Sequence, residues 1–269
     1  MKSKRCDNEE YTMKNAVITG STSGIGQGMA RALAMAGYAV VLNGFGDAAA
    51  IEADRQALAD AAGVPVLYHG ADMTQPEQIA DLVAYATREL GSVDILVNNA
   101  GVQHVAPIED FPAAKWEQIL AINLSSVFYS IQAAVPGMKQ RGWGRIINLA
   151  SAHALVASPY KVAYVAAKHG VAGITKTVAL ELAEAGITCN AICPGYVKTP
   201  LVEHQIADTA RARGISEEDV RRDVLLKAQP TRQFTTVEEI GALTVFLASE
   251  AARNMTGSLL SMDGGWTAQ

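Results

Sequence analysis

The chain has 269 residues with a formal net charge of -5, and 49% of its residues are hydrophobic. This composition allows a large core, organised as one domain or two small ones, while the acidic balance argues against nucleic acid and anionic membrane surfaces as partners. No apolar run approaches the ~18 residues of a membrane span, so we expect no membrane partner.

The N-terminal segment and the cysteines indicate the compartment. Residues 1–13 carry charges of both signs and lack the apolar stretch of a signal peptide, so we expect a solvated, disordered tail. Cys6, Cys189 and Cys193 form no disulfide or redox pattern, which favours free thiols and a cytoplasmic localisation. The histidines are scattered without metal-site spacing, so no metal is expected.

A strand, a glycine loop and a helix open the folded part of the chain. The β-branched run 15–19 is followed by Gly20, Gly24 and Gly26, and then by a helical pattern that Gly37 ends. Glycines in such a loop permit a tight turn and let backbone amides approach a pyrophosphate at the helix N-terminus. A glycine loop alone is a weak signal, because many folds join a strand to a helix in this way.

The segment after the second strand bears on the choice of cofactor. Residues 38–42 are predicted to be a strand, and dinucleotide folds place the residue that binds the adenosine ribose just after it. No acidic residue ends this strand, but no Lys or Arg stands between Asn43 and Arg55 to receive a 2′-phosphate. The pattern therefore favours NAD over NADP.

Strands and helices alternate through the rest of the chain. Strand patterns cover 64–69, 93–97, 145–149, 187–192 and 258–262, and helical patterns cover 48–62, 76–90, 113–138, 161–184 and 236–247. This alternation predicts an α/β fold, a single doubly wound, Rossmann-like parallel sheet with helices on both faces. We expect one domain over 14–269, in which 197–228 is a small helical cover over the substrate. Asp72 either accepts a hydrogen bond from an adenine amino group or caps the helix that follows.

The stretch 148–175 carries the strongest chemical signal. Ser151 follows a strand, and Tyr164 and Lys168 lie one turn apart on the face of the predicted helix. A lysine ammonium near a phenol, together with a cofactor cation, favours the phenolate. An ordinary amphipathic Tyr/Lys pair is the alternative. Asn123 stands inside a helical pattern, where asparagine is unfavourable unless its amide is hydrogen-bonded.

Together these motifs resemble the short-chain dehydrogenase/reductase family over nearly the whole chain after residue 13. They are TGSTSGIG at 19–26, NNAG at 98–101, Asn123, Ser151, YVAAK at 164–168 and PG at 194–195. The resemblance implies a nicotinamide cofactor and a homotetramer with the helices 113–138 and 161–184 at one interface.

The resemblance also implies roles for individual residues. Tyr164 would be the general acid/base, and Lys168 would hold the cofactor ribose and lower the pKa of Tyr164. Ser151 would hydrogen-bond the substrate oxygen, and Asn123 would anchor a water that relays the proton. The implied cofactor-binding residues are Gly20, Thr22, Ser23, Gly24, Ile25, Gly26, Phe45, Asp72, Met73, Asn99, Ala100, Gly101, Tyr164, Lys168, Pro194, Gly195, Val197 and Thr199.

A narrower resemblance is to the bacterial D-3-hydroxybutyrate dehydrogenases of this family, through Gln103-His104, His153, Lys161 and the segment 194–206. It implies NAD-dependent, reversible oxidation of D-3-hydroxybutyrate to acetoacetate. A small hydroxy acid brings a carboxylate into a closed pocket, where an unpaired charge is costly. The implied substrate-binding residues are Gln103, Ser151, His153, Lys161, Tyr164, Tyr196, Gln205 and Trp266.

Alternatives remain at this stage. Lys161 is also compatible with a solvated helix start, Gln205 with a surface position and His153 with a turn cap. Tyr196 stands where this subfamily often has Trp, which leaves the preference for four-carbon over five-carbon acids open. Other functions are an NADPH-dependent 3-ketoacyl-thioester reductase and a non-catalytic NAD(H)-binding regulator. The reductase would need basic residues for the 2′-phosphate, and the regulator would not need Ser151, Tyr164 and Lys168 together.

Overall fold

A single parallel sheet organises the molecule. The computed structural model describes residues 13–199, 202–203, 206–207, 210–211 and 214–268, so the predicted tail, apart from Met13, and also Gln205 lie outside the described residues. Seven strands pair in the order β3-β2-β1-β4-β5-β6-β7. They are β1 (Asn15–Ile18), β2 (Ala39–Asn43), β3 (Val66–His69), β4 (Ile95–Asn98), β5 (Gly144–Leu149), β6 (Ile187–Pro194) and β7 (Leu259–Met262).

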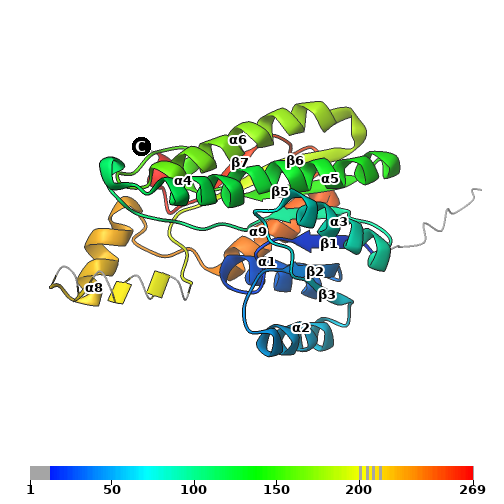
Figure 1. Ribbon diagram of the computed structural model, residues 1–269, viewed down its shortest axis with the longest axis horizontal. Helices are drawn as coiled ribbons and strands as arrows, with labels where there is room; N and C mark the ends of the chain where they lie inside the picture. Colours follow the sequence, from blue (N-terminus) through cyan, green and yellow to red (C-terminus); the bar gives the residue numbers. More distant parts are fainter. Residues whose placement is uncertain (1–12, 200–201, 204–205, 208–209, 212–213, 269) are drawn as a thin grey trace, which may run out of the picture.

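Helices cover both faces of this sheet (Figure 1). One layer is α3 (Pro76–Leu90), α5 (Ser126–Arg141) and α6 (Val162–Leu182), and the other is α1 (Gly24–Met35), α2 (Ala48–Ala62) and α9 (Val237–Ala248). Successive strand residues point to opposite faces, so Val17 enters the core under the first layer and Ile18 the core under the second. The predicted doubly wound fold is confirmed. Its strand order reverses between β1 and β4, where open sheets bind ligands at the carboxyl ends of the strands.

The helix predicted over 113–138 contains a local irregularity. α4 (Ala113–Leu120) continues into α5 through a π-helical turn, Ala121–Ser125, and the span ends at Arg141. By length and composition alone, Ala113–Arg141 would qualify as a membrane-crossing helix, but it packs against α3 and α6 as part of the layered fold. The π turn widens the helix at Asn123, and such turns are frequent at functional sites.

The last helix begins as the sequence predicts. Thr236 is the N-cap of α9, and its hydroxyl accepts a hydrogen bond from the backbone N of Glu239. The Glu239 carboxylate in turn accepts from the backbone N of Thr236 at 2.7 Å. These two bonds form a capping box, which fixes the start of α9.

The segment between β6 and α9 has a small core of its own. Ile206, Ala210 and Val220 are buried together, with Phe234 packed against them. A short helix, α8 (Glu217–Asp219), continues through a π-helical turn to Leu225 and a 3₁₀ turn to Ala228. The described part of this segment therefore has a folded interior as well as polar contacts on its surface.

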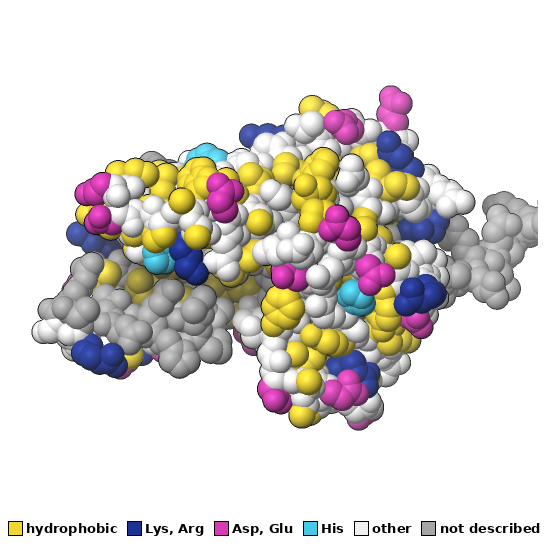
Figure 2. All heavy atoms as spheres, in the orientation of Figure 1, with side chains coloured by type: hydrophobic (Ala, Val, Ile, Leu, Met, Phe, Trp, Pro, Cys, Tyr) yellow, Lys and Arg dark blue, Asp and Glu magenta, His cyan; other side chains and the backbone are white. Residues whose placement is uncertain are grey.

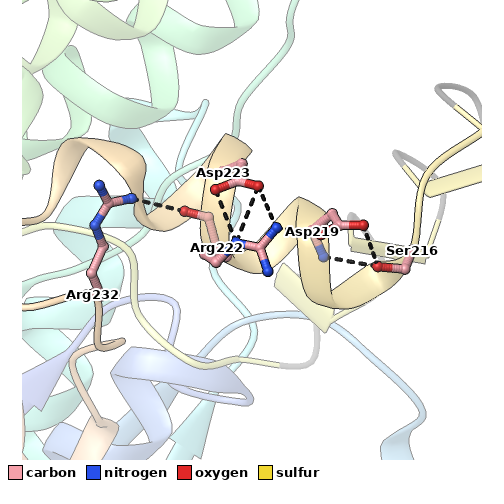
Figure 3. A network of polar contacts seen from close by, with 5 residues as sticks. All are labelled: Ser216, Asp219, Arg222, Asp223 and Arg232. Atoms are coloured by element: carbon pink, nitrogen blue, oxygen red, sulfur yellow. Dashed lines mark hydrogen bonds and ion pairs between the residues drawn. The ribbon is translucent and has the colours of Figure 1, made fainter.

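Charged side chains stabilise the outer side of the same segment (Figure 3). Ser216 caps α8 by accepting from the backbone N of Asp219, and Arg222 forms ion pairs with Asp219 and Asp223. Arg232 donates to the backbone O of Arg222 at 3.0 Å. Because these ion pairs are exposed to solvent, they add little to the stability of the fold. They order the surface of the segment, whereas its buried apolar residues hold it together.

Candidate active site

A cleft of about 530 Å³ opens at the carboxyl ends of the central strands. It is lined by all of the predicted cofactor-binding residues: Gly20, Thr22, Ser23, Gly24, Ile25, Gly26, Phe45, Asp72, Met73, Asn99, Ala100, Gly101, Tyr164, Lys168, Pro194, Gly195, Val197 and Thr199. The predicted substrate-binding residues that line it are Gln103, Ser151, His153, Lys161, Tyr164, Tyr196 and Trp266. The fold thus brings together residues that are up to 246 positions apart in the chain, between Gly20 and Trp266.

The glycine loop at one end of the cleft fits a phosphate group. Gly20 has a positive φ of 62°, and a Cβ on it would lie 2.8 Å from the Cα of Ala100. A Cβ on Gly26 would collide with the side chain of Asn99. Ser23, the N-cap of α1, makes no side-chain capping bond. The first amides of α1 are therefore not capped by that side chain, as an anion site at a helix N-terminus requires.

Asn99 joins the glycine loop to the end of β4. Its side-chain Nδ2 donates to the backbone O of Thr19 at 2.9 Å and to that of Gly20 at 2.7 Å. Its backbone N donates to Thr19 Oγ1 at 3.0 Å. These bonds need small residues on both sides, which accounts for the glycine and alanine that follow Asn99.

The end of β2 presents no positive charge to the cleft. Asn43 uses its whole side-chain amide internally: Nδ2 donates to the backbone O of His69 and of Ala71, and Oδ1 accepts from the backbone N of Gly20. A Cβ on Gly44 would lie 2.5 Å from Thr22 Oγ1. Of the described residues that line the cleft, Lys161 and Lys168 are the ones with a basic side chain.

Asp72 lines the cleft but does not cap α3. Its Oδ1 accepts from the backbone N and the hydroxyl of Thr74, at 2.8 Å each, while Gln75 occupies the N-cap position. The capping interpretation is therefore wrong, because the carboxylate orders the turn before the helix instead. Its second oxygen makes no hydrogen bond to another residue within the described part of the chain.

Ser151, Tyr164 and Lys168 meet beyond the end of β5. Lys168 is buried, and its Nζ donates to the backbone O of Leu149 at 2.7 Å and lies 5.5 Å from the centre of the Tyr164 ring. Burial lowers the pKa of Lys168 to about 8. Burial raises the pKa of Tyr164, and the hydrogen bond from Ser151 opposes this rise only in part. At Tyr164 the effect of burial is therefore larger than the opposing effect of Ser151.

Asn123 lies behind this group and is 1% exposed. Its Oδ1 accepts from the backbone N of Val102, and its Nδ2 donates to the backbone O of the same residue, both at 2.9 Å. The π turn places this amide against the loop that follows β4. The amide of Asn123 is thus hydrogen-bonded in the interior, as expected for an asparagine inside a helix. Asn123 does not itself line the cleft.

Aromatic rings and Lys161 line the other end of the cleft. The Tyr196 and Trp266 rings stack at 5.7 Å, and the ring of His153 meets Trp266 edge-on at 5.1 Å. Lys161 Nζ lies 5.5 Å from the centre of the Tyr196 ring, and burial lowers its pKa. This end of the cleft is therefore lined by stacked and edge-on aromatic rings, and it carries one lysine.

Both ring nitrogens of His153 are engaged within the protein. Nδ1 lies 3.3 Å from Ser151 Oγ, and Nε2 lies 2.8 Å from Ser158 Oγ. Burial, with Lys161 and His169 nearby, lowers the pKa of His153 to about 4. His153 is thus a neutral wall of the cleft that contacts Ser151, and it presents no free nitrogen to a ligand.

Comparison with known proteins agrees with this geometry. A family model described as enoyl-(acyl carrier protein) reductase matches residues 20–267. The chain is 60% identical to a D-beta-hydroxybutyrate dehydrogenase of Rhizobium meliloti (strain 1021), covering 95% of this chain and 99% of that one. It is 56% identical to the enzyme of the same name from Cupriavidus necator (strain ATCC 17699), covering 95% and 98%. The structure of levodione reductase superposes with a TM-score of 0.87 at 31% identity, covering 95% and 98%.

The chain belongs to the short-chain dehydrogenase/reductase family. As a short-chain dehydrogenase it is an oxidoreductase that uses a nicotinamide cofactor, and the glycine loop and free helix terminus described above fit the phosphates of such a group. The membership explains why the trio of Ser151, Tyr164 and Lys168 stands beside a dinucleotide-sized cleft. It does not by itself distinguish NAD from NADP.

Several residues of the site were not named individually as site residues from the sequence. The cleft is also lined by Asn43, Gly44, Ala71, Val102, Ile122, Leu149, Ala150 and Val202. Behind it, Gln229 is fully buried and its Oε1 accepts from the backbone N of Tyr196, while the Asp263 carboxylate accepts from the backbone N of Gly265 and Thr267. Gln229 and Asp263 hold Tyr196 and the turn that bears Trp266. Only the three-dimensional contacts identify them, because each acts on residues distant in sequence or through backbone atoms.

Proposed function

We propose that this short-chain dehydrogenase reversibly oxidises D-3-hydroxybutyrate to acetoacetate with NAD. The observation that carries the substrate is Lys161, a half-buried lysine that lines the cleft beside the Tyr196 ring, three residues before Tyr164. A carboxylate that enters this space finds a counter-charge next to the catalytic group. The names of the two enzymes at 60% and 56% identity support the same substrate.

In the proposed mechanism Tyr164 acts as the general base in alcohol oxidation. NAD, when bound, supplies the hydride acceptor and a positive charge in the cleft. Tyr164 Oη takes the hydroxyl proton, and Ser151 donates a hydrogen bond to the substrate oxygen, which gains negative charge as the proton leaves. Positive charge near the phenol favours its ionised form and offsets the burial that raises its pKa.

Lys168 and Asn123 support this step. The Lys168 ammonium has three donors and uses one on Leu149, so two remain for the ribose hydroxyls of a cofactor. Its burial against the end of β5 fixes the position of its charge in the cleft. Asn123 holds the loop after β4 in place through Val102, and we propose that it also anchors the water that carries the proton outward.

The charge distribution of the cleft favours NAD over NADP. Lys161 and Lys168 are its basic residues among those described, and both lie at the catalytic end of the cleft. At the end of β2, where a ribose would bind, the Asn43 amide is fully engaged and the Gly44-Phe45-Gly46 turn carries no charge. A 2′-phosphate there would lack the basic partner that NADP-dependent members of such folds use.

The surface also supports the expected homotetramer. Figure 2 shows hydrophobic side chains over the face formed by α4, α5 and α6. Phe128 on α5 and Leu180 on α6 are large apolar side chains with 49% and 81% exposure. We propose that this face packs against a second copy in a cytoplasmic homotetramer, that 197–228 covers the bound substrate, and that Gln205 and Gln103 contribute amides to its carboxylate.

Steady-state kinetics of the purified protein test the proposed substrate. We expect D-3-hydroxybutyrate with NAD to be turned over far better than the L enantiomer, and better than acetoacetyl-CoA is reduced with NADPH. Preferred reduction of the thioester with NADPH would replace this proposal with the 3-ketoacyl-thioester reductase. Binding of NADH without turnover of any secondary alcohol would favour a non-catalytic NAD(H)-binding regulator.

Replacement of Tyr164 tests the proposed mechanism. Tyr164→Phe should abolish turnover while leaving NADH binding intact, because only the hydroxyl is removed. Fluorescence titration with NADH measures the binding separately from the rate. Substantial residual turnover in this variant would remove Tyr164 from the role of general base.

A further inference from the structure

A chain of three polar side chains runs from a surface loop to the catalytic centre. Ser158 lies on the loop before α6, half-buried, and its Oγ is 2.8 Å from His153 Nε2. His153 Nδ1 is 3.3 Å from Ser151 Oγ, and the backbone N of His153 donates to the same oxygen at 3.2 Å. We call Ser158, His153 and Ser151 the hydroxyl–imidazole chain. Of the three, Ser151 and His153 line the cleft and Ser158 does not.

The imidazole in this chain is neutral. Its pKa is about 4, because burial and the nearby charges of Lys161 and His169 oppose protonation. A neutral imidazole donates from one nitrogen and accepts at the other. Two arrangements are therefore open: either Ser158 donates to Nε2 and Nδ1–H donates to Ser151, or Nε2–H donates to Ser158 and Ser151 donates to Nδ1.

The Ser151 hydroxyl decides between these arrangements. In the mechanism proposed above, Ser151 donates its proton toward the substrate oxygen, where negative charge develops. A hydroxyl has one proton, so a Ser151 that donates toward Tyr164 or the substrate oxygen has none left for Nδ1. The proton between Ser151 and His153 must then sit on Nδ1, and Nε2 must accept from Ser158.

We propose that Ser158 is a positioning residue that fixes His153 as its Nδ1–H tautomer, and thereby directs the Ser151 hydroxyl toward Tyr164 and the reacting oxygen. The proposal rests on the catalytic roles proposed for Ser151 and Tyr164. It extends them to a residue on a different loop, whose side chain does not line the cleft. Without Ser158, Nε2 loses its donor, and the tautomer that withdraws the Ser151 proton becomes accessible.

Other titratable groups face the same chain. Lys161 and His169, both from the region of α6, lower the pKa of His153. Tyr196, after β6, raises the pKa of Tyr164. Cys193 at the end of β6 has a pKa of about 11, because burial outweighs its hydrogen bond with the Ser151 backbone and the charge of Lys168. None of these side chains changes in the Ser158 variants below, so a shift between variants reports on the hydroxyl–imidazole chain.

The tautomer can be observed directly by NMR. Long-range nitrogen–proton correlation of ¹⁵N-histidine-labelled protein in its NAD complex, at alkaline pH, distinguishes Nδ1–H from Nε2–H imidazoles. The signals of His153 are those that disappear in His153→Asn. We expect Nδ1–H in the wild type and a loss of this preference in Ser158→Ala. An Nε2–H imidazole in the wild type would overturn the proposal, whichever alcohol the enzyme prefers.

Kinetics give a second readout that a purely structural role would not produce. In Ser158→Ala we expect the acidic limb of the kcat/KM profile for alcohol oxidation to move upward by about half a unit to one unit, the equivalent of one lost hydrogen bond. NADH affinity and the KM for the acid should stay close to wild type. Ser158→Thr, which keeps the hydroxyl, should restore the profile.

Two controls separate this effect from general disturbance. Ser249→Ala removes a hydroxyl that donates to the backbone O of Phe246 at the far end of α9, and it should leave the profile unchanged. On a His153→Asn background, Ser158→Ala should have no further effect, because the group it orients is gone. An unchanged profile in Ser158→Ala, or additive losses in the double variant, would refute the positioning role.

Discussion

Replacing Lys161 with methionine tests how the enzyme recognises a charged substrate. Methionine keeps an unbranched apolar stem of similar length and removes only the ammonium. Truncating one partner of a desolvated charge pair costs about 2–5 kcal/mol, and the half-buried position of Lys161 argues for the lower end of that range. We therefore expect kcat/KM for D-3-hydroxybutyrate to fall by about 30-fold, the equivalent of ~2 kcal/mol.

A neutral alcohol separates the loss of charge from damage to the site. 2-Butanol has the carbon skeleton and the secondary hydroxyl of 3-hydroxybutyrate but no carboxylate. Initial rates with both alcohols should show the loss for the hydroxy acid and little change for 2-butanol. Lys176→Met changes an exposed lysine on the same helix and serves as the control. Equal losses for both alcohols, or none for either, would refute the proposed contact.

The same residue predicts a pH dependence. Burial lowers the pKa of Lys161, so its charge is complete below the lowered value and is lost as the pH rises through it. Because only the ammonium attracts the carboxylate, the KM for D-3-hydroxybutyrate should rise with pH over that interval in the wild type. The rise should be missing in Lys161→Met, whose side chain does not titrate, and a rise of equal size in both proteins would assign it to another group.

Three further changes probe the cofactor site, the fold and the substrate end. Gly26→Ala should weaken NADH binding in fluorescence titrations while CD shows a folded protein, because the added methyl displaces Asn99; unchanged affinity would contradict the close packing. Thr236→Ala removes the capping box and should lower the free energy of unfolding by about 1 kcal/mol in urea titrations. Tyr196→Trp should raise the preference for 3-hydroxybutyrate over 3-hydroxyvalerate, because a larger ring leaves less space beside Trp266. A preference equal to that of the wild type would mean that the extra carbon of 3-hydroxyvalerate does not lie against this ring.

Local patterns predicted the parts of the site that depend on local chemistry. The glycine loop, the small residues after β4 and the i, i+4 pair on α6 each require particular residue types at fixed spacing, and the structure brings all of them to one cleft. The strands could be predicted because both faces of a parallel sheet are buried, which produces continuous apolar runs.

Other features depend on contacts that no local pattern records. The π turn at Asn123 inserts one residue into an otherwise regular helix, and a 3.6-residue period continues on both sides of it. Gln229 acts on Tyr196, which lies 33 positions earlier in the chain. The engagement of both nitrogens of His153 depends on Ser158 at a specific distance, so the resemblance that implied a substrate contact for His153 gave no indication of these internal hydrogen bonds.

Lys161, the N-cap of α6, and Lys168 within the helix relate the length of the substrate to its charge. Lys161 and Lys168 are seven residues apart, or about 10 Å along a helix that rises 1.5 Å per residue, with Tyr164 between them. The reacting carbon must lie at Tyr164. The Lys161 ammonium therefore meets the substrate group that is only a few bonds from that carbon, and in a 3-hydroxy acid this group is the carboxylate. A 3-ketoacyl thioester has a neutral carbonyl there and leaves the desolvated ammonium without a counter-charge. The thioester is disfavoured because its binding would remove solvent from the ammonium without supplying a counter-charge, and a buried, unpaired charge is costly.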